Sequence, residues 1–196
     1  MASPADTAGS PPGSRPGQLI VLTGPPGAGK TTVATLLADQ YSPSVHLHAD
    51  DFWHVIRRGA VAPYRRQAHR QNTIVITALA RAASAYAGGG YHVIVDGIIG
   101  PWFIELFRTA AEMPPDRIHY LILRPDEATT LRRAADRGDD ALTALEPLRT
   151  MYRQFTELGS YERHVINSAG LTPAGTADRT REAVTGRRFL LAPSPS

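Results

Sequence analysis

Residues 24–32 read GPPGAGKTT, and the lysine in this stretch, Lys30, is the only lysine in the chain. Gly24, Gly29, Lys30 and Thr31 match the Walker A pattern G-x-x-x-x-G-K-[ST], a loop that surrounds phosphates with backbone N–H groups. A compact ammonium group on a flexible stem can reach between the β- and γ-phosphates, whereas the planar guanidinium group of arginine has a different reach and geometry. The lysine therefore lies where phosphate chemistry requires a point charge.

The sequence on either side of the loop fits this interpretation. Residues 18–24 (QLIVLTG) form a short apolar run rich in β-branched side chains, and residues 31–40 (TTVATLLADQ) carry apolar side chains at helical spacing. Strand, glycine loop and helix in this order are the context that the motif requires. An ordinary glycine and proline turn before a helix is the alternative.

The loop predicts a site for ATP and Mg²⁺. The glycines allow backbone N–H groups to point inward, and the helix N-terminus adds positive potential. The Thr31 hydroxyl is placed to ligate Mg²⁺. The residues expected to bind the nucleotide are Gly24, Gly27, Ala28, Gly29, Lys30, Thr31 and Thr32.

Length and composition predict one α/β domain. The chain has 196 residues, of which 42% are hydrophobic. Residues 1–17 and 189–196 read as Pro- and Ser-rich tails around a domain at residues 18–188, and residues 1–17 lack the features of a signal peptide. No apolar run approaches 18 residues, and the chain contains no cysteine. We therefore expect a cytoplasmic protein without disulfides or a membrane span.

Strand and helix patterns alternate along the chain. Strands are expected at residues 18–24, 44–48, 91–97, 118–124 and 163–168, with helices at 31–40, from 52, and at 64–87, 100–113, 126–138, 145–158 and 176–186. This alternation predicts a five-stranded and mostly parallel sheet with helices on both faces. With the Walker A loop and the arginine-bearing helix at residues 126–138, we expect a P-loop NTPase fold with a short helical lid.

Acidic side chains follow two of the predicted strands. Asp96 ends VIVDG in the manner of a Walker B carboxylate and should lie near Thr31 and the metal, although it could also be a simple turn residue. Asp50 lies in HADDFW, where a carboxylate can accept the proton of an attacking hydroxyl group. Asp51 offers a second polar group, and Phe52 and Trp53 a stacking wall. As alternatives, Asp51 caps a helix and the two aromatic residues belong to the core.

Arginines form two further clusters. Arg133 and Arg137, four residues apart in LRRAADRG, could close over ATP and stabilise the transferred phosphoryl group, or could simply face water. A second cluster could recognise an acidic acceptor or be solvated; it comprises Arg57, Arg58, Arg65, Arg66, His69 and Arg70. The imidazoles of His46, His48 and His54 lack the further ligand spacing that would complete a zinc site.

Together these motifs resemble the small P-loop kinases grouped around chloramphenicol phosphotransferase, polynucleotide 5′-kinase and the zeta-toxin kinases. The resemblance covers residues 18–188 and rests on GPPGAGKTT, DDFW, VIVDG and LRRAADRG. It implies a five-stranded parallel sheet, Asp50 as the acid that activates the acceptor hydroxyl, and lid arginines at Arg133 and Arg137.

Two departures from these families leave the acceptor open. Polynucleotide kinases carry an arginine where this chain has Trp53, which makes a nucleic-acid acceptor less expected. Chloramphenicol phosphotransferases have one acid followed by a small residue, where this chain has Asp51 and Phe52. Unusual polar and aromatic residues near the sheet ends predict an acceptor pocket that includes Tyr64, Gln71, Asn72 and Trp102.

The resulting hypothesis is an ATP-dependent phosphotransferase that acts on a hydroxyl group of a small antibiotic, nucleoside-like or sugar-like molecule. The alternatives are an ATP-binding protein that sequesters a ligand or acts as a switch, and a polynucleotide 5′-kinase.

Overall fold

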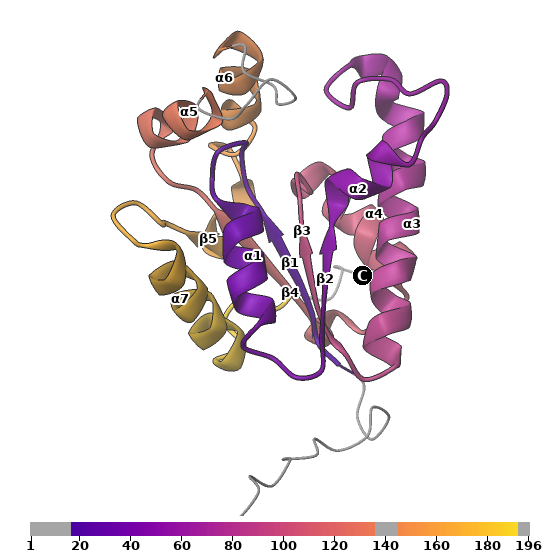
Figure 1. Cartoon of the computed structure of the whole chain (residues 1–196), viewed down its shortest axis with the longest axis vertical. Coiled ribbons are helices and arrows are strands. Elements are labelled where there is room, and N and C mark those ends of the chain that lie inside the picture. The colour runs from indigo at the N-terminus through magenta and orange to yellow at the C-terminus, as the bar shows by residue number, and fades with distance from the viewer. Residues whose placement is uncertain (1–16, 136–144, 192–196) are drawn as a thin grey trace, which may run out of the picture.

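The computed structural model describes residues 17–135 and 145–191. Its centre is a five-stranded sheet in the order β2-β3-β1-β4-β5, and every pair of neighbouring strands is parallel. The sheet with its flanking helices confirms the predicted α/β P-loop NTPase fold (Figure 1). The strands are β1 (Leu19–Thr23), β2 (Ser44–His48), β3 (His92–Asp96), β4 (Ile118–Leu123) and β5 (Val165–Ile166).

Helices cover both faces of the sheet, while α5 and α6 lie beyond its C-terminal edge (Figure 1). One face is packed by α3 and α4, and the other by α1 and α7. The helices are α1 (Lys30–Ala38), α2 (Ala49–His54), α3 (His69–Gly88), α4 (Pro101–Ala111), α5 (Glu127–Ala135), α6 (Leu145–Arg153) and α7 (Pro173–Thr185). No helix in the described ranges is long and apolar enough to cross a membrane.

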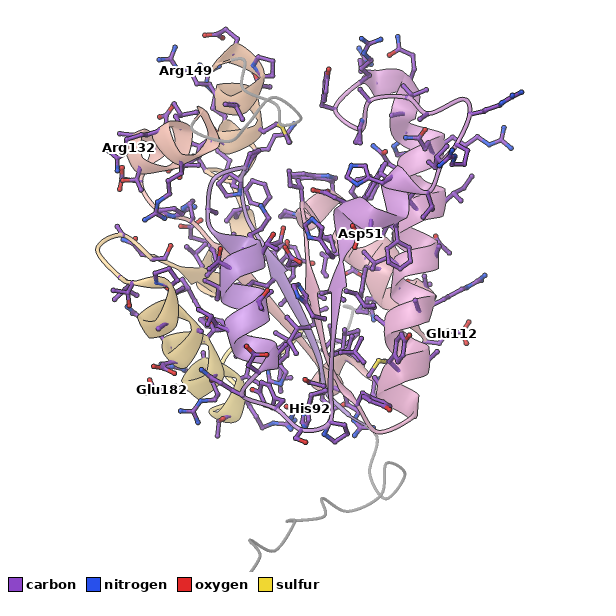
Figure 2. All side chains as sticks on the ribbon, viewed as in Figure 1. Asp51, His92, Glu112, Arg132, Arg149 and Glu182 are labelled. Carbon is purple, nitrogen blue, oxygen red and sulfur yellow. The ribbon has the colours of Figure 1, made fainter. Side chains whose placement is uncertain are left out.

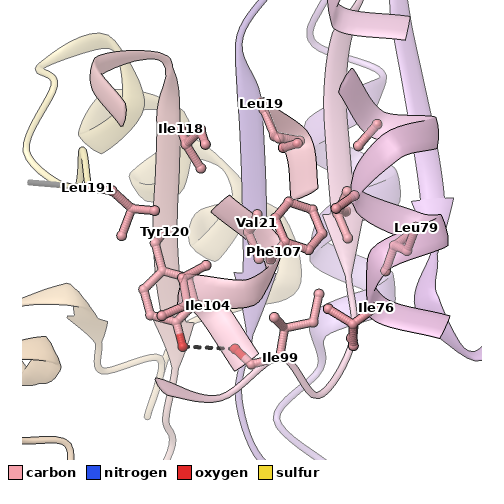
Figure 3. Close-up of a cluster of buried hydrophobic side chains, with 14 of the residues drawn as sticks. Leu19, Val21, Ile76, Leu79, Ile99, Ile104, Phe107, Ile118, Tyr120 and Leu191 are labelled. Carbon is pink, nitrogen blue, oxygen red and sulfur yellow. Dashed lines mark hydrogen bonds between the residues drawn. The ribbon is translucent and has the colours of Figure 1, made fainter. Parts of the chain in front are cut away.

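The core follows from the two-residue period of the strands. Leu19 and Val21 of β1 face the α3 and α4 side with Phe107 (Figure 3), while Ile20 and Leu22 face the α1 and α7 side. All five residues of β1 are buried, as expected for a central strand of a sheet covered on both faces. The central strand is therefore fixed firmly enough to carry the loop that follows it.

Three helices begin three or more residues from the predicted start, and α7 is one of them, beginning at Pro173 and not at residue 176. The helix expected from residue 52 begins at Ala49, so Asp50 and Asp51 lie in its first turn and His48 occupies the N-cap position. Asp51 is therefore not the helix cap. The helix expected from residue 64 begins at His69, after a short 3-10 turn at Arg66–Ala68. The side chains of Gln71 and Asn72 hold residues 61 and 63 in the preceding loop, which explains the later start.

The packed domain extends past residue 188, where the sequence had placed the start of a tail. Leu190 forms an antiparallel bridge with His119, and the amide of Leu191 donates to the carbonyl of Ile118. Because β5 pairs only with the C-terminal end of β4, residues 189–191 complete the other end of that strand. Leu191 is buried in the core.

Candidate active site

The Walker A stretch forms the loop between β1 and α1. Gly27 and Gly29 both adopt φ of +85°, and Gly29 is the N-cap residue of α1. A Cβ atom on Gly27 would lie 2.2 Å from the carbonyl oxygen of Thr130 in α5. The glycine at this position is thus required both by the backbone conformation and by the close approach of α5.

Lys30 begins α1 and lies inside the loop. The residue is only 7% exposed, and its Nζ atom donates a hydrogen bond of 3.0 Å to the carbonyl oxygen of Pro25. The ammonium group is therefore held by the loop that the sequence assigns to phosphate binding.

Thr31 and Asp96 meet between α1 and the end of β3. The hydroxyl of Thr31 donates a hydrogen bond of 2.7 Å to Oδ2 of Asp96, whose side chain is fully buried. The predicted Walker A threonine and Walker B carboxylate are thus adjacent, although 65 residues separate them in the chain. This position argues against Asp96 as a simple turn residue.

Two histidines of β2 approach the other oxygen of Asp96. Nε2 of His46 lies 2.7 Å and Nδ1 of His48 lies 3.0 Å from Oδ1. Burial alone would raise the pKa of Asp96, but hydrogen bonds from His46, Thr31 and His48 outweigh it and lower that pKa. The buried carboxylate is therefore stabilised as an anion.

His48 also faces Asp50. Its Nε2 atom lies 3.6 Å from Oδ2 of Asp50, whose side chain is 60% exposed. Burial would lower the pKa of His48, but the hydrogen bond and charge of Asp96, with the charges of Asp50 and Asp51, raise it. One imidazole thus lies between a buried carboxylate and an accessible one. Asp51 is exposed on the same short helix (Figure 2).

Arg133 lines a cavity of about 230 Å³ beside the loop. Ala28, Gly29, Thr32 and Val33 form one wall, and residues after β5 form another. The neighbouring Arg132 is exposed on α5 (Figure 2). Arg137, the second predicted lid arginine, lies outside the described residues.

Several predicted acceptor residues shape the loop before α3. Gln71 exchanges two hydrogen bonds with the backbone of Val61, and Asn72 donates to the carbonyl of Pro63. The indole N–H of Trp53 donates to the side-chain oxygen of Asn72 over 2.9 Å. These polar groups are thus taken up in bracing the loop.

The remaining predicted acceptor residues are dispersed. Tyr64 is 56% exposed in the same loop, and Phe52 packs against the core and lines a cavity bounded by α2 and α3. Trp102 lies at the start of α4, is 46% exposed, and has its ring centroid 5.6 Å from that of Phe155.

The loop after β3 is fixed by residues that the sequence analysis did not single out. The amide of Ile99 donates a hydrogen bond of 2.9 Å to the hydroxyl of Thr23. The carbonyl of Ile99 accepts a hydrogen bond of 2.8 Å from the hydroxyl of Tyr120 (Figure 3). The path from Asp96 to Trp102 is thereby tied to β1 and β4.

The sequence analysis also missed residues that border the 230 Å³ cavity after β5. These are Ser168, Leu171, Pro173 and Thr176. The hydroxyl of Ser168 is buried and has no hydrogen-bond partner among the described residues. The rule that ligands of open α/β sheets bind beyond the C-terminal ends of the strands would have directed attention to this loop.

Comparison with solved structures supports the fold. A sugar kinase from Janibacter sp. HTCC2649 matches with TM-score 0.67 and 21% identity over 87% of this chain and 95% of that one. A tunicamycin resistance protein from Deinococcus radiodurans matches with TM-score 0.66 and 17% identity over 90% of this chain and 99% of that one. Shikimate kinase from Acinetobacter baumannii, in complex with shikimate, matches with TM-score 0.63 and 18% identity over 87% of this chain and 94% of that one.

Sequence comparison gives a broader assignment than the resemblance proposed above. Among curated proteins, no sequence matches this chain. The profile of the family described as AAA domain (AAA_33) matches residues 19–158, which include the Walker A loop, both histidines of β2, Asp50, Asp96 and Arg133. Because this match covers well over half of the sequence, the chain belongs to the AAA domain family.

Proposed function

We propose that the protein is an ATP-dependent kinase that transfers the γ-phosphoryl group to a hydroxyl group of a small molecule, with Asp50 as the general base. The observation that carries this proposal is the arrangement of Thr31, Asp96 and Asp50. The first two lie 2.7 Å apart beside the Walker A loop, and the accessible carboxylate of Asp50 is linked to Asp96 through His48.

The oxygen atoms that meet between the start of α1 and the end of β3 fit Mg²⁺. A threonine hydroxyl and a carboxylate are hard oxygen ligands, and Mg²⁺ in kinases is usually held by one or two protein ligands together with substrate phosphates. Thr31 would contact the ion, with Asp96 beside it, and the bound ion would neutralise charge on the β- and γ-phosphate oxygens. The backbone of residues 24–29 and the ammonium group of Lys30 would hold the same phosphates.

In the proposed reaction, Asp50 receives the proton of the acceptor hydroxyl. The acceptor oxygen forms a bond to the γ-phosphorus while the bond to the bridging oxygen breaks, and ADP leaves with that electron pair. His48 would hold the carboxylate of Asp50 in place. Because Asp50 is 60% exposed, it can meet an acceptor that enters from solvent.

The cavity of about 230 Å³ suits the nucleotide. It adjoins the loop at Ala28 and Gly29, and the guanidinium group of Arg133 can stack on a base or neutralise phosphate charge. Ser168 offers a buried hydroxyl that lacks a partner among the described residues. We assign ATP to this cavity and, with Arg137, a lid role to Arg133.

The acceptor is proposed to be a small hydroxylated molecule of the antibiotic, nucleoside or sugar type. The structures of similar fold support this class, since they include a sugar kinase and shikimate kinase. Trp102 and Tyr64 are exposed aromatic side chains that an acceptor could contact. We propose the cytoplasm as the place of action. We further propose that the chain belongs with the small P-loop kinases grouped around chloramphenicol phosphotransferase, polynucleotide 5′-kinase and the zeta-toxin kinases.

The test is to incubate the protein with ATP and Mg²⁺ and a panel of hydroxylated antibiotics, nucleosides and sugars, and to detect phosphorylated acceptor by mass spectrometry. We expect product formation with the natural chain and with Asp39→Asn, an exposed acid after α1, but not with Asp50→Asn, which should still bind ATP. A compound that binds in an ATP-dependent manner without gaining phosphate would support ligand sequestration instead. Phosphorylation of oligonucleotide 5′ ends would support the polynucleotide kinase alternative.

A further inference from the structure

A second and larger cavity, of about 540 Å³, lies between α2, the loop after it, and α3. Its volume falls within the range of small-molecule sites. Most of its lining is apolar and comes from Phe52, Val55, Ile56, Val61, Ile74 and Val75. Val55 is 71% and Ile74 is 59% exposed, so this lining presents apolar surface to solvent.

This cavity is separate from the proposed kinase site. Neither Asp50 nor any residue of the Walker A loop lines it. Phe52 lines the cavity, whereas Asp50, two residues earlier in α2, faces His48 of β2. Residues two apart in a helix point in widely different directions. A molecule in this cavity would therefore contact the side of α2 that faces away from the general base.

After Asp50 and Asp51 in the first turn of α2, the segment that builds the cavity carries no acidic side chain. Residues 52–95 contain no aspartate or glutamate but six arginines, of which Arg70 lines the cavity. None of the six forms an ion pair with a described residue. Gln71 uses its amide on Val61, so Arg70 and Gln67 are the polar lining side chains left to meet a ligand. Arg70 is the one charged side chain of the lining, so charge complementarity favours a negatively charged ligand.

We propose that this cavity binds an amphipathic organic anion, a small molecule with an apolar body and an anionic head. The apolar body would cover Val55 and Ile74, and the head would meet the guanidinium group of Arg70. This inference goes beyond the proposed kinase function and does not depend on it. One side of α2 would then carry the general base Asp50, and the other side, with Phe52, would contact the bound anion.

The test is titration calorimetry of the full chain with monomeric decanoate, with decanol and decyltrimethylammonium as probes of the same length but different charge. Decanoate should bind at least about fivefold more tightly than either of the other two compounds. Its carboxylate can accept a charge-assisted hydrogen bond from Arg70, which is stronger than the neutral bond that decanol can form, and the ammonium compound would be repelled. Equal binding of the ammonium compound would overturn the assignment of an anion.

Variants locate the bound probe. Val55→Asp and Ile74→Asp should each weaken decanoate binding about tenfold or more, because they place a carboxylate against the tail. Tyr86→Asp is the matched control, since Tyr86 is an exposed apolar residue of the same helix outside the cavity. Arg70→Gln should weaken binding of decanoate but not of decanol, whereas Arg81→Gln, also exposed on α3 and outside the cavity, should leave both unchanged.

Two results would overturn the proposal. One is decanoate binding that Val55→Asp and Ile74→Asp leave unchanged in proteins with unaltered thermal unfolding and ATP binding. The other is binding to vesicles of anionic phospholipid without binding of monomeric decanoate, which would assign the cationic segment to a membrane surface.

Discussion

His48 and Asp96 lie side by side at the ends of neighbouring parallel strands, paired in register, with Nδ1 of the imidazole 3.0 Å from Oδ1 of the carboxylate. The other ring nitrogen of His48 lies 3.6 Å from Asp50. The same side chain therefore contacts both acids that the proposed reaction uses. Groups that orient a metal ligand or a catalytic base typically contribute about 10- to 100-fold to affinity or rate.

His48→Gln should lower kcat about tenfold or more with little change in KM for ATP, because Asp50 loses the group that orients it. His46→Gln is the comparison, since His46 contacts Asp96 over 2.7 Å but has no contact with Asp50. It should raise the Mg²⁺ concentration required for half-maximal activity and change kcat less. Steady-state kinetics across Mg²⁺ concentrations separate these effects. Identical profiles for the two variants would mean that His48 acts through Asp96 alone.

Thr31→Ala should weaken binding of ATP in the presence of Mg²⁺ about tenfold, while binding of ATP without Mg²⁺ changes little. The hydroxyl is the proposed metal contact, and its loss also removes a hydrogen bond from the buried Asp96. Calorimetric titration with and without Mg²⁺ measures both affinities. Thr35→Ala on the same helix is the control, because Thr35 is exposed and its hydroxyl donates to the backbone carbonyl of Thr31. Equal losses with and without Mg²⁺ would contradict a metal role for Thr31.

The fold was predictable because its strongest signals are local in sequence. An apolar run, a glycine-rich loop and a helical repeat lie within residues 18–40, and the alternation of strands and helices fixes a parallel sheet. The pairing of Thr31 with Asp96 could be expected for the same reason, since both follow from motifs with known places at the strand ends.

The contacts of His46 and His48 were not predictable from the sequence. They depend on the register between β2 and β3, which places both imidazoles against a carboxylate about 50 residues away. The late start of α3 likewise depends on particular partners, namely the bonds of Gln71 and Asn72 to the backbone of the loop before them. Local patterns carry no record of such partners.

Gly27 and Gly29 form a pair that separates backbone strain from steric overlap. Both have φ of +85°. A Cβ atom added to Gly27 would lie 2.2 Å from the carbonyl oxygen of Thr130, whereas a Cβ atom added to Gly29 would have no atom within 4 Å. Gly29→Ala should lower the free energy of unfolding by about 1–2 kcal/mol through strain alone. Gly27→Ala should cost about 1–3 kcal/mol more, because α5 must move. Chemical denaturation measures both values, and equal losses would show that α5 does not constrain the loop.

His119 should make stability depend on pH. The residue is fully buried in β4, and burial, with the positive charge of Arg187, lowers its pKa from 6.5 to about 4. As pH falls below 6.5 the unfolded chain takes up a proton at this position while the folded chain does not, so stability decreases until pH approaches the folded pKa. The loss attributable to His119 across this window is about 3 kcal/mol.

His119→Leu should remove that dependence. Both ring nitrogens of His119 lack a hydrogen-bond partner among the described residues, so an apolar side chain of similar size should be tolerated near pH 7. The measurement is the free energy of unfolding near pH 7 and near pH 5 for both proteins. Other groups also titrate between these values, so the informative quantity is the difference between the two proteins at each pH. The free energy of unfolding of the variant should rise relative to that of the natural chain as pH falls. If both proteins lose the same free energy of unfolding between pH 7 and pH 5, His119 is not the responsible group.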